Sequence, residues 1–201
     1  MALPGIYQQT IFSGHAALAP SLFIRAMHPK TEIRPDRATI KRVLDAQWCG
    51  QLKIHGHRVQ FHVPAEPTLD IFAYTRQGTL HKKPIPAPLA TELRRLFAPP
   101  SGWNVVDGEW LKAEDRVFVF DFLKKDNRLL SSLTYTERLA MLPRVFNVNC
   151  IETLPIYRTV DKCLAAMDRP ESYIEGLVFK SLNTPGFADT SIIRCRRSPR
   201  Y

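Results

Sequence analysis

Two apolar runs that lie close together in the sequence constrain the fold of this chain more than any other feature. The first run covers residues 104–111 and the second covers 116–123, and only four residues, 112–115, separate them. Short runs rich in Val, Phe and Trp are typical of β-strands, and a short polar link favours antiparallel pairing. We therefore expect a β-hairpin in the middle of the chain.

Further strands and helices are predicted on both sides of this hairpin. Asp36 is a predicted N-cap for a helix over 37–46, and the capping-box sequence at 134–137 opens a helix that we expect to extend to about Val145. Two more helices are expected near 89–97 and over 160–167. The other predicted strands lie in 51–63 (two strands joined at Gly56), 69–75, 173–181 and 191–196. The sum is an α+β fold with mostly antiparallel sheets flanked by helices over residues 36–201, preceded by an irregular segment, 1–35.

Composition narrows the class of protein. No apolar run reaches the roughly 18 residues of a membrane span, and the N-terminus lacks the basic stretch of a signal peptide. The four cysteines are scattered, which is typical of reduced thiols. We expect a monomeric protein that is not secreted, makes no membrane contact and lies in the cytoplasm, at the nucleoid or in a phage-infected cell.

The charge of the chain favours a polyanionic partner. With 28 Lys and Arg against 19 Asp and Glu, the formal net charge is +9. Such a balance on a small domain indicates nucleic acid. A basic surface kept for solubility explains the charge equally well, so composition alone leaves both interpretations open.

A lysine lies inside one of the predicted strands, three residues before Gly56. The uncharged amine of such a lysine is a nucleophile, and Arg58 is a cation that we expect nearby, across the turn. On this fragment alone, the ordinary interpretation of Lys53 is a strand lysine whose ammonium reaches solvent. The segments that follow it change this interpretation.

Six short segments occur in a fixed order, each at the end of a predicted strand. They read KIHGHR at 53–58, YTRQG at 74–78, VDGEWL at 106–111, VFVFDFL at 117–123, EGLVFK at 175–180 and IRCR at 193–196. This series resembles motifs I, Ia, III, IIIa, IV and V of the covalent nucleotidyltransferases, the superfamily of ATP-dependent DNA ligases, RNA ligases and mRNA capping enzymes. Residues 133–142 also resemble the helix that follows motif IIIa in DNA ligases. The resemblance spans 48–196 and implies an ATP-grasp-like adenylyltransferase domain.

The resemblance assigns a role to each motif. It implies that Lys53 is the nucleophile that carries AMP as a phosphoramide, and that Glu175 and Glu109 bind Mg²⁺ or Mn²⁺, with Glu109 also near a ribose hydroxyl. Carboxylates are hard ligands that suit these ions. The other residues implied in nucleotide binding are Gln51, Leu52, Arg58, Arg76, Phe120, Lys180, Arg194 and Arg196.

Within this set, Phe120 is expected to stack on the purine, and the basic side chains are expected to hold phosphates and the ribose side of the nucleotide. Arg194 and Arg196 alternate on a predicted strand, so both point to one face. Asp107 and Asp121 are interpreted as structural.

Two motifs depart from the family pattern. Motif I has His55 where most members have Asp, as in some RNA ligases, yet Arg58 matches DNA ligases and capping enzymes. Motif V has Arg194 and Arg196 in place of two lysines, which keeps the charge and adds bidentate phosphate geometry. The sequence ends five residues after Arg196, where most members continue into an OB-fold. We therefore expect a minimal domain or a fragment, with substrate contacts from residues 1–35, from the basic tail, or from a protein partner.

The resemblance implies an ATP-dependent polynucleotide ligase that seals nicks between a 5′-phosphate and a 3′-hydroxyl, as in DNA repair and replication. The implied cofactors are ATP and Mg²⁺ or Mn²⁺, and the implied partner is a nicked duplex, with DNA favoured over RNA. The alternatives are an RNA ligase, a GTP-dependent mRNA guanylyltransferase, and a non-catalytic relative that only binds nucleotide or nucleic acid.

Overall fold

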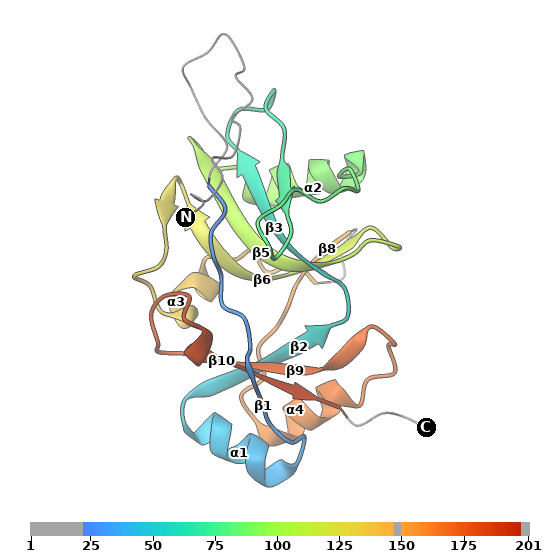
Figure 1. Ribbon diagram of the computed structural model, residues 1–201, viewed down its shortest axis with the longest axis vertical. Helices are drawn as coiled ribbons and strands as arrows, with labels where there is room; N and C mark the ends of the chain where they lie inside the picture. Colours follow the sequence, from blue (N-terminus) through green and yellow to red (C-terminus); the bar gives the residue numbers. More distant parts are fainter. Residues whose placement is uncertain (1–21, 147–149, 198–201) are drawn as a thin grey trace, which may run out of the picture.

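Two β-sheets form the framework of the protein (Figure 1). The computed structural model describes residues 22–146 and 150–197. The first sheet has six strands, in the order β4-β3-β5-β6-β7 with β8 beside β6, and the second has four, in the order β1-β10-β9-β2. Among the strands of the described residues, only β1–β10 and β6–β8 pair in parallel. The predicted α+β fold with mostly antiparallel sheets is confirmed.

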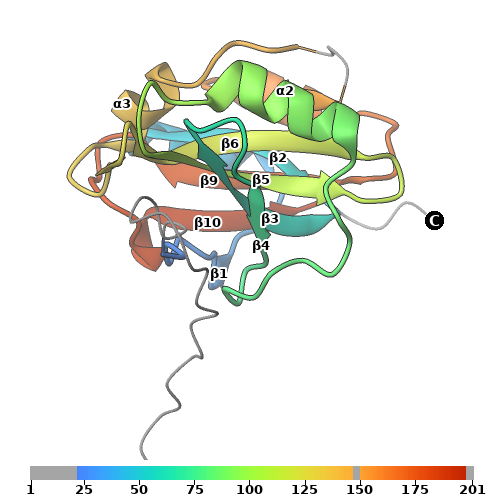
Figure 2. The same cartoon turned by 90° about the horizontal axis from the view of Figure 1, so that it is seen from above.

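The six-stranded sheet is built around the predicted central hairpin. Its strands are β3 (His57–Pro64), β4 (Phe72–Tyr74), β5 (Trp103–Leu111), β6 (Arg116–Lys125), β7 (Arg128–Leu129) and β8 (Ile151–Thr153). Strands β5 and β6 pair antiparallel, as predicted, with Asp107 opposite Asp121. Helix α2 (Ala87–Phe97) packs on this sheet through Leu89, Leu93 and Phe97 (Figure 2).

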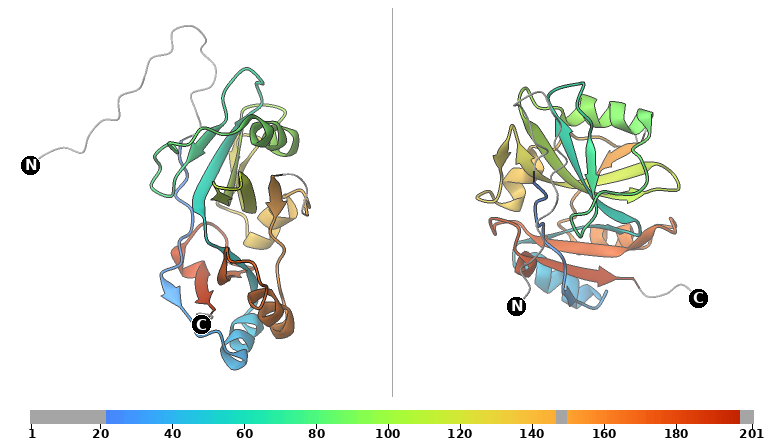
Figure 3. Two further views of the ribbon diagram at one scale, coloured as in Figure 1. Left: turned by 90° about the vertical axis from the view of Figure 1, so that its right-hand side faces the viewer. Right: turned by 45° about the horizontal axis from the view of Figure 1, so that its top comes forward.

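The four-stranded sheet has one apolar face and one polar face. Its strands are β1 (Thr31–Glu32), β2 (Trp48–Ile54), β9 (Ile174–Ser181) and β10 (Ile192–Arg196). Helices α1 (Arg37–Asp45) and α4 (Val160–Met167) cover the apolar face, where Ile40 and Cys163 pack with Leu177 (Figure 3). Because side chains alternate along a strand, Gln51 and Lys53 on β2 point the other way, toward the six-stranded sheet.

Local capping explains where the helices begin. Asp36 caps α1 by accepting from the Thr39 N–H, and Thr134 with Glu137 forms the predicted capping box of α3 (Tyr135–Ala140). The α3 helix is shorter than the predicted extension to Val145, because Pro143 follows shortly after the C-cap, Met141.

Two other boundaries also differ from the sequence prediction. Strand β4 covers only 72–74 of the predicted 69–75, since the Leu69 N–H bonds to the Glu66 carbonyl in a turn. A short 3₁₀-helix, Asp189–Ser191, comes just before β10. No helix in the described part of the chain is long and apolar enough to cross a membrane.

The predicted irregular segment 1–35 is described only from residue 22 onward. Within it, Thr31 and Glu32 form β1, opposite Ile193 and Arg194 of β10. The predicted domain boundary at residue 36 stays a prediction. Residues 1–21 lie outside the described residues.

Candidate active site

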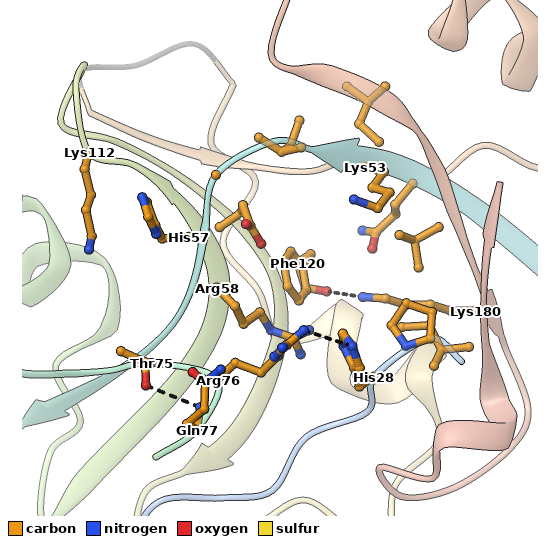
Figure 4. Close-up of a pocket in the computed structure, with 18 of the residues that line it drawn as sticks. His28, Lys53, His57, Arg58, Thr75, Arg76, Gln77, Lys112, Phe120 and Lys180 are labelled. Atoms are coloured by element: carbon orange, nitrogen blue, oxygen red, sulfur yellow. Dashed lines mark hydrogen bonds between the residues drawn. The ribbon is translucent and has the colours of Figure 1, made fainter. Parts of the chain in front are cut away.

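A pocket of about 390 Å³ lies between the polar face of the four-stranded sheet and the six-stranded sheet (Figure 4). Strands β2, β9 and β10 line one side, and β3, β5 and β6 line the other. Eight of the residues predicted to form the site line this pocket: Gln51, Leu52, Lys53, Arg58, Arg76, Glu109, Phe120 and Lys180. The structure therefore brings together segments that are up to 129 positions apart in the sequence.

A β-bulge places Glu175 beside Lys53. Lys53 pairs with Gly176, but the next pair is Ile54 with Ile174, which leaves Glu175 as an extra residue on β9. A bulge turns a side chain in a new direction. The ammonium of Lys53 donates to one carboxylate oxygen of Glu175, and Nδ1 of His55 contacts the other.

Gly176 makes this bulge possible. Its φ is +144°, a conformation that other residues rarely adopt, and a Cβ there would lie 2.2 Å from the Cys195 carbonyl oxygen. Only glycine fits between β9 and β10 at this point. This close approach explains why a glycine follows Glu175 in the sequence.

The two glutamates of the pocket differ in their electrostatics. Burial acts to raise the pKa of Glu175, but hydrogen bonds from Lys53 and His55 outweigh it, so the pKa is below its ordinary value. Burial raises the pKa of Glu109 to about 7, although Arg58 and Lys53 act in the opposite direction. Glu175 therefore stays a carboxylate at neutral pH, whereas Glu109 is partly protonated.

Arg58 is held by Asp107 beneath the pocket. Its Nε donates to Oδ1 of Asp107 at 2.6 Å and its Nη2 donates to Oδ2, while Nη2 also reaches the Met27 carbonyl at 3.3 Å. The guanidinium carbon lies 4.8 Å from the centre of the Phe120 ring. This bidentate pair fixes Arg58 at the pocket wall.

A buried hydrogen-bond network forms the wall around Lys180. Its ammonium contacts the Phe120 carbonyl and the Tyr135 hydroxyl, each at 3.3 Å, and lies 4.4 Å from the centre of each of those two rings. The Tyr135 hydroxyl is also 2.7 Å from Oε1 of Gln51, whose amide nitrogen donates to the Leu154 carbonyl at 3.0 Å. Burial lowers the pKa of Lys180 to about 8.

Arg76 lies at the rim of the pocket, in the turn after β4. Its Nη1 is 3.0 Å from Nε2 of His28, and its neighbours Thr75 and Gln77 also line the pocket (Figure 4). The turn is closed by the Gly78 N–H, which donates to the Thr75 carbonyl at 2.9 Å.

Arg194 and Arg196 do not line the pocket. The register of β10 against β9 places Arg194 opposite Val178 and Arg196 opposite Gly176. Both therefore lie on the sheet face of Lys53, as their alternation predicted, but both turn to Glu32 on β1, at 2.8 Å and 3.8 Å. Their phosphate-binding role stays a prediction.

Solved structures of DNA ligases match the fold of this chain. A mycobacterial DNA ligase D complexed with ATP and MES gives a TM-score of 0.56 at 15% identity, over 76% of this chain and 55% of that chain. The ligase domain of M. tuberculosis LigD gives 0.55 at 17% identity, over 74% and 53%. A structure from a study of Lig E DNA ligases gives 0.54 at 12% identity, over 87% and 70%. This chain has the fold of a ligase adenylyltransferase domain.

The chain spans about half the length of the two ligase D structures. No family model matches it, and no curated protein matches it. At these identities the comparison shows the adenylyltransferase fold alone, so the roles of the individual residues rest on the geometry of the pocket.

Glu109 and Glu175 supply only part of the ligand shell that a magnesium ion needs. Among the described residues, no group of three or more His, Cys, Asp or Glu side chains is arranged to hold a metal. Mg²⁺ is usually held by one or two carboxylates together with the phosphates of the substrate. Glu109 lines the pocket and Glu175 lies beside it, bonded to Lys53, so both fit that incomplete protein shell.

Several residues of the pocket were missed by the sequence prediction. They are His28, Pro29, Ile54, Gly56, His57, Thr75, Gln77, His81, Lys112, Val178 and Ile192. Six of them lie inside the recognised motifs, where their position was the available signal: Ile54, Gly56, His57, Thr75, Gln77 and Val178. His28 and His81 had no signal, because tertiary packing alone brings them to the pocket.

Proposed function

We propose that this chain is the adenylyltransferase domain of an ATP-dependent polynucleotide ligase, with Lys53 as the nucleophile. The observation that carries this proposal is the position of Lys53, whose ammonium lies in the pocket between the two sheets beside Glu175, in a ligase fold. The side chain is only 22% exposed. A lysine amine at the wall of a charged pocket suits covalent transfer of a nucleotide.

The first step forms a phosphoramide. The uncharged amine of Lys53 attacks the α-phosphorus of ATP, a P–N bond forms, and the P–O bond to the β-phosphate breaks. Pyrophosphate leaves with the electron pair of that bond, and the amine gives up its proton to solvent. Arg76 and Lys180, two cations of the pocket, offset the charge of the phosphates.

The second and third steps join the strands. An oxygen of the 5′-phosphate at a nick attacks the phosphorus of the lysyl-AMP, the P–N bond breaks, and Lys53 takes up a proton. The 3′-hydroxyl then attacks the 5′-phosphate, a phosphodiester bond forms, and AMP leaves while the hydroxyl proton goes to water. Each step exchanges one bond at phosphorus for another, so no oxidant or reductant is required.

The other residues of the pocket bind and orient the nucleotide. Phe120 offers a ring to the purine, and Gln51 and Leu52 lie next to Lys53 on β2. Glu109 lines the pocket and would accept from a ribose hydroxyl, and together with Glu175 it would hold Mg²⁺ or Mn²⁺ in the complex. When bound, such an ion neutralises charge on the triphosphate.

Labelled nucleotides test the covalent step directly. With labelled ATP and Mg²⁺ the wild-type protein is expected to become labelled, and Lys53→Ala is expected to lose all label. The matched control is Lys41→Ala, since Lys41 is an exposed lysine that pairs only with Asp45, and it should label like the wild type. A label that forms with GTP alone would make the guanylyltransferase alternative correct.

DNA is the favoured acceptor. The net charge of +9 suits a polyanion, and the Lig E study that matches the fold describes DNA binding with a minimal scaffold. A second candidate is RNA, because His55 replaces the usual aspartate of motif I and contacts Glu175. Sealing of matched nicks with DNA or RNA on each side separates the two. Closure of the RNA nicks alone would contradict the preference for DNA.

A further inference from the structure

Residues 22–33 connect the two sheets alongside the pocket, and we call them the N-terminal strap (Figures 1 and 4). At one end Ile24 binds the six-stranded sheet, where its carbonyl accepts from the Gln60 amide at 2.6 Å. At the other end the Ile33 N–H donates to the Arg194 carbonyl of β10 at 3.0 Å. The strap is therefore fixed to both sides of the site.

His28 lies in the middle of the strap and its backbone is anchored. The preceding residue, Met27, is 4% exposed and its sulfur is 3.0 Å from the Ser191 hydroxyl. The His28 N–H donates to Oδ1 of Asp189 at 2.8 Å. These contacts set the position of the imidazole before any ligand binds.

The strap also contacts the turn that carries Arg76. Gly78 closes this turn with a φ of +80°, and a Cβ on it would lie 2.9 Å from the ring of Phe23 in the strap. Phe23 therefore packs against one end of the turn while His28 meets Arg76 at the other. The strap and the turn form a single packed unit.

The hydrogen bond between Arg76 and His28 defines the chemical state of the histidine. Nη1 of Arg76 is 3.0 Å from Nε2 of His28. A guanidinium has only donors, so Nε2 must be the acceptor. His28 in this bond is consequently neutral, with its proton on Nδ1. A proton on Nε2 would remove the lone pair and place a second cation beside Arg76.

We propose that His28 is a positioning residue, which in its neutral form holds Arg76 at the rim of the nucleotide pocket and releases Arg76 when it is protonated. The proposal rests on the proposed function, because it takes the ligand of this pocket to be a nucleotide. Arg76 meets the phosphates, and His28 acts through Arg76.

The charges around His28 favour its neutral form. Burial is the largest cause that lowers its pKa, and Arg76, Arg58 and Arg194 act in the same direction. Asp189 opposes them, but the pKa remains below its ordinary value. The bond to Arg76 is therefore present at neutral pH and is lost as the pH falls through the pKa of the folded protein.

The test compares three proteins that differ only at position 28. The affinity for α,β-methylene-ATP, which Lys53 cannot cleave, is measured between pH 5 and 8 for wild type, His28→Gln and His28→Ala. The glutamine oxygen accepts from Arg76 at the position of Nε2 but does not titrate. His28→Ala should bind about 3- to 10-fold more weakly at pH 8, the effect of one charge-assisted hydrogen bond, whereas His28→Gln should match the wild type.

On acidification the wild type should lose more affinity than His28→Gln and approach His28→Ala. The ratio of wild type to His28→Gln at each pH is the readout, because the analogue, Glu109 and the other pocket histidines titrate in all three proteins. An equal loss of affinity in wild type and His28→Gln would overturn the proposal, as would full affinity in His28→Ala.

NMR of the imidazole gives a readout that needs no nucleotide. At neutral pH the free protein should show the Nδ1–H tautomer of His28, and Arg76→Gln should raise the pKa of His28. A dominant Nε2–H tautomer contradicts the proposal. If the analogue binds and these results hold but no lysyl-AMP forms, the ligase function fails while the role of His28 stands. If the lysyl-AMP forms but His28 shows the Nε2–H tautomer, the role of His28 fails while the ligase function stands.

Discussion

Among single residues, Lys180 is notable because its ionisable side chain is buried in the wall of the pocket. It is 3% exposed, and its contacts are the rings of Phe120 and Tyr135, the Phe120 carbonyl and the Tyr135 hydroxyl. The sequence indicated a basic residue at the end of motif IV but gave no sign of the tyrosine. Tyr135 lies at the start of α3, 45 positions before Lys180, so only the tertiary packing reveals this contact.

The lowered pKa of Lys180 gives a stability prediction. Its pKa is about 8 in the folded protein and near its ordinary value of 10.5 when unfolded. Between these values the unfolded chain binds more protons, so this group makes the free energy of unfolding rise with pH and lowers stability below the folded pKa. Lys180→Met should remove that rise in chemical denaturation between pH 7.5 and 10.5. The same pH slope in both proteins would show that Lys180 is not perturbed.

At the scale of elements, local signals predicted individual strands and helices, and tertiary contacts decided how they combine. The caps at Asp36 and Thr134 were readable because a side chain and the backbone three residues later are neighbours in sequence. The sequence did not predict that β2 and β3 belong to different sheets, because only His55 and Gly56 lie between the two strands. This separation places Lys53 and Arg58 on opposite walls of one pocket.

The bulge in β9 depends on Gly176, and substitution of this glycine tests that dependence. Gly176→Ala would set a Cβ against the Cys195 carbonyl at a φ that alanine avoids, and we expect a loss of at least about 2 kcal/mol in thermal or chemical unfolding. Gly50→Ala is the matched control on the neighbouring strand, because the three atoms nearest to its Cβ would all belong to side chains, Cys163 Sγ at 3.1 Å being the nearest. Equal losses in the two variants would contradict this account of the bulge.

A buried ion pair joins α3 to β6. Arg138 is 0% exposed and donates to both carboxylate oxygens of Asp121, at 2.9 Å and 3.1 Å, in keeping with the structural role predicted for Asp121. Arg138→Ala would leave this carboxylate buried without its cation, and we expect a loss of about 3–5 kcal/mol in chemical denaturation.

The control for that variant is an exposed pair of the same type. Arg37 and Asp161 have side chains that are 65% and 79% exposed, so Arg37→Ala should cost less than about 1 kcal/mol. If the two arginine variants were equally stable, the packing of α3 on β6 would not depend on the ion pair.

At the scale of the whole molecule, two sheets meet at one pocket and each contributes part of its chemistry. The order of the motifs placed eight predicted residues there, but it did not predict the turn of Arg194 and Arg196 toward Glu32. That contact depends on β1, which pairs with a strand 162 positions away in the sequence, β10. With only two residues, β1 is too short to show the alternating pattern that predicts a strand. For the same reason His28 was not predicted individually, although residues 1–35 were expected to supply substrate contacts.

Peptide mapping by mass spectrometry after incubation with ATP and Mg²⁺ tests most directly whether the Lys53 amine carries a nucleotide. We predict one acid-labile AMP modification, on the peptide that contains Lys53, and its disappearance on addition of pyrophosphate. AMP on any other lysine, or an unmodified protein that still binds ATP, would contradict it.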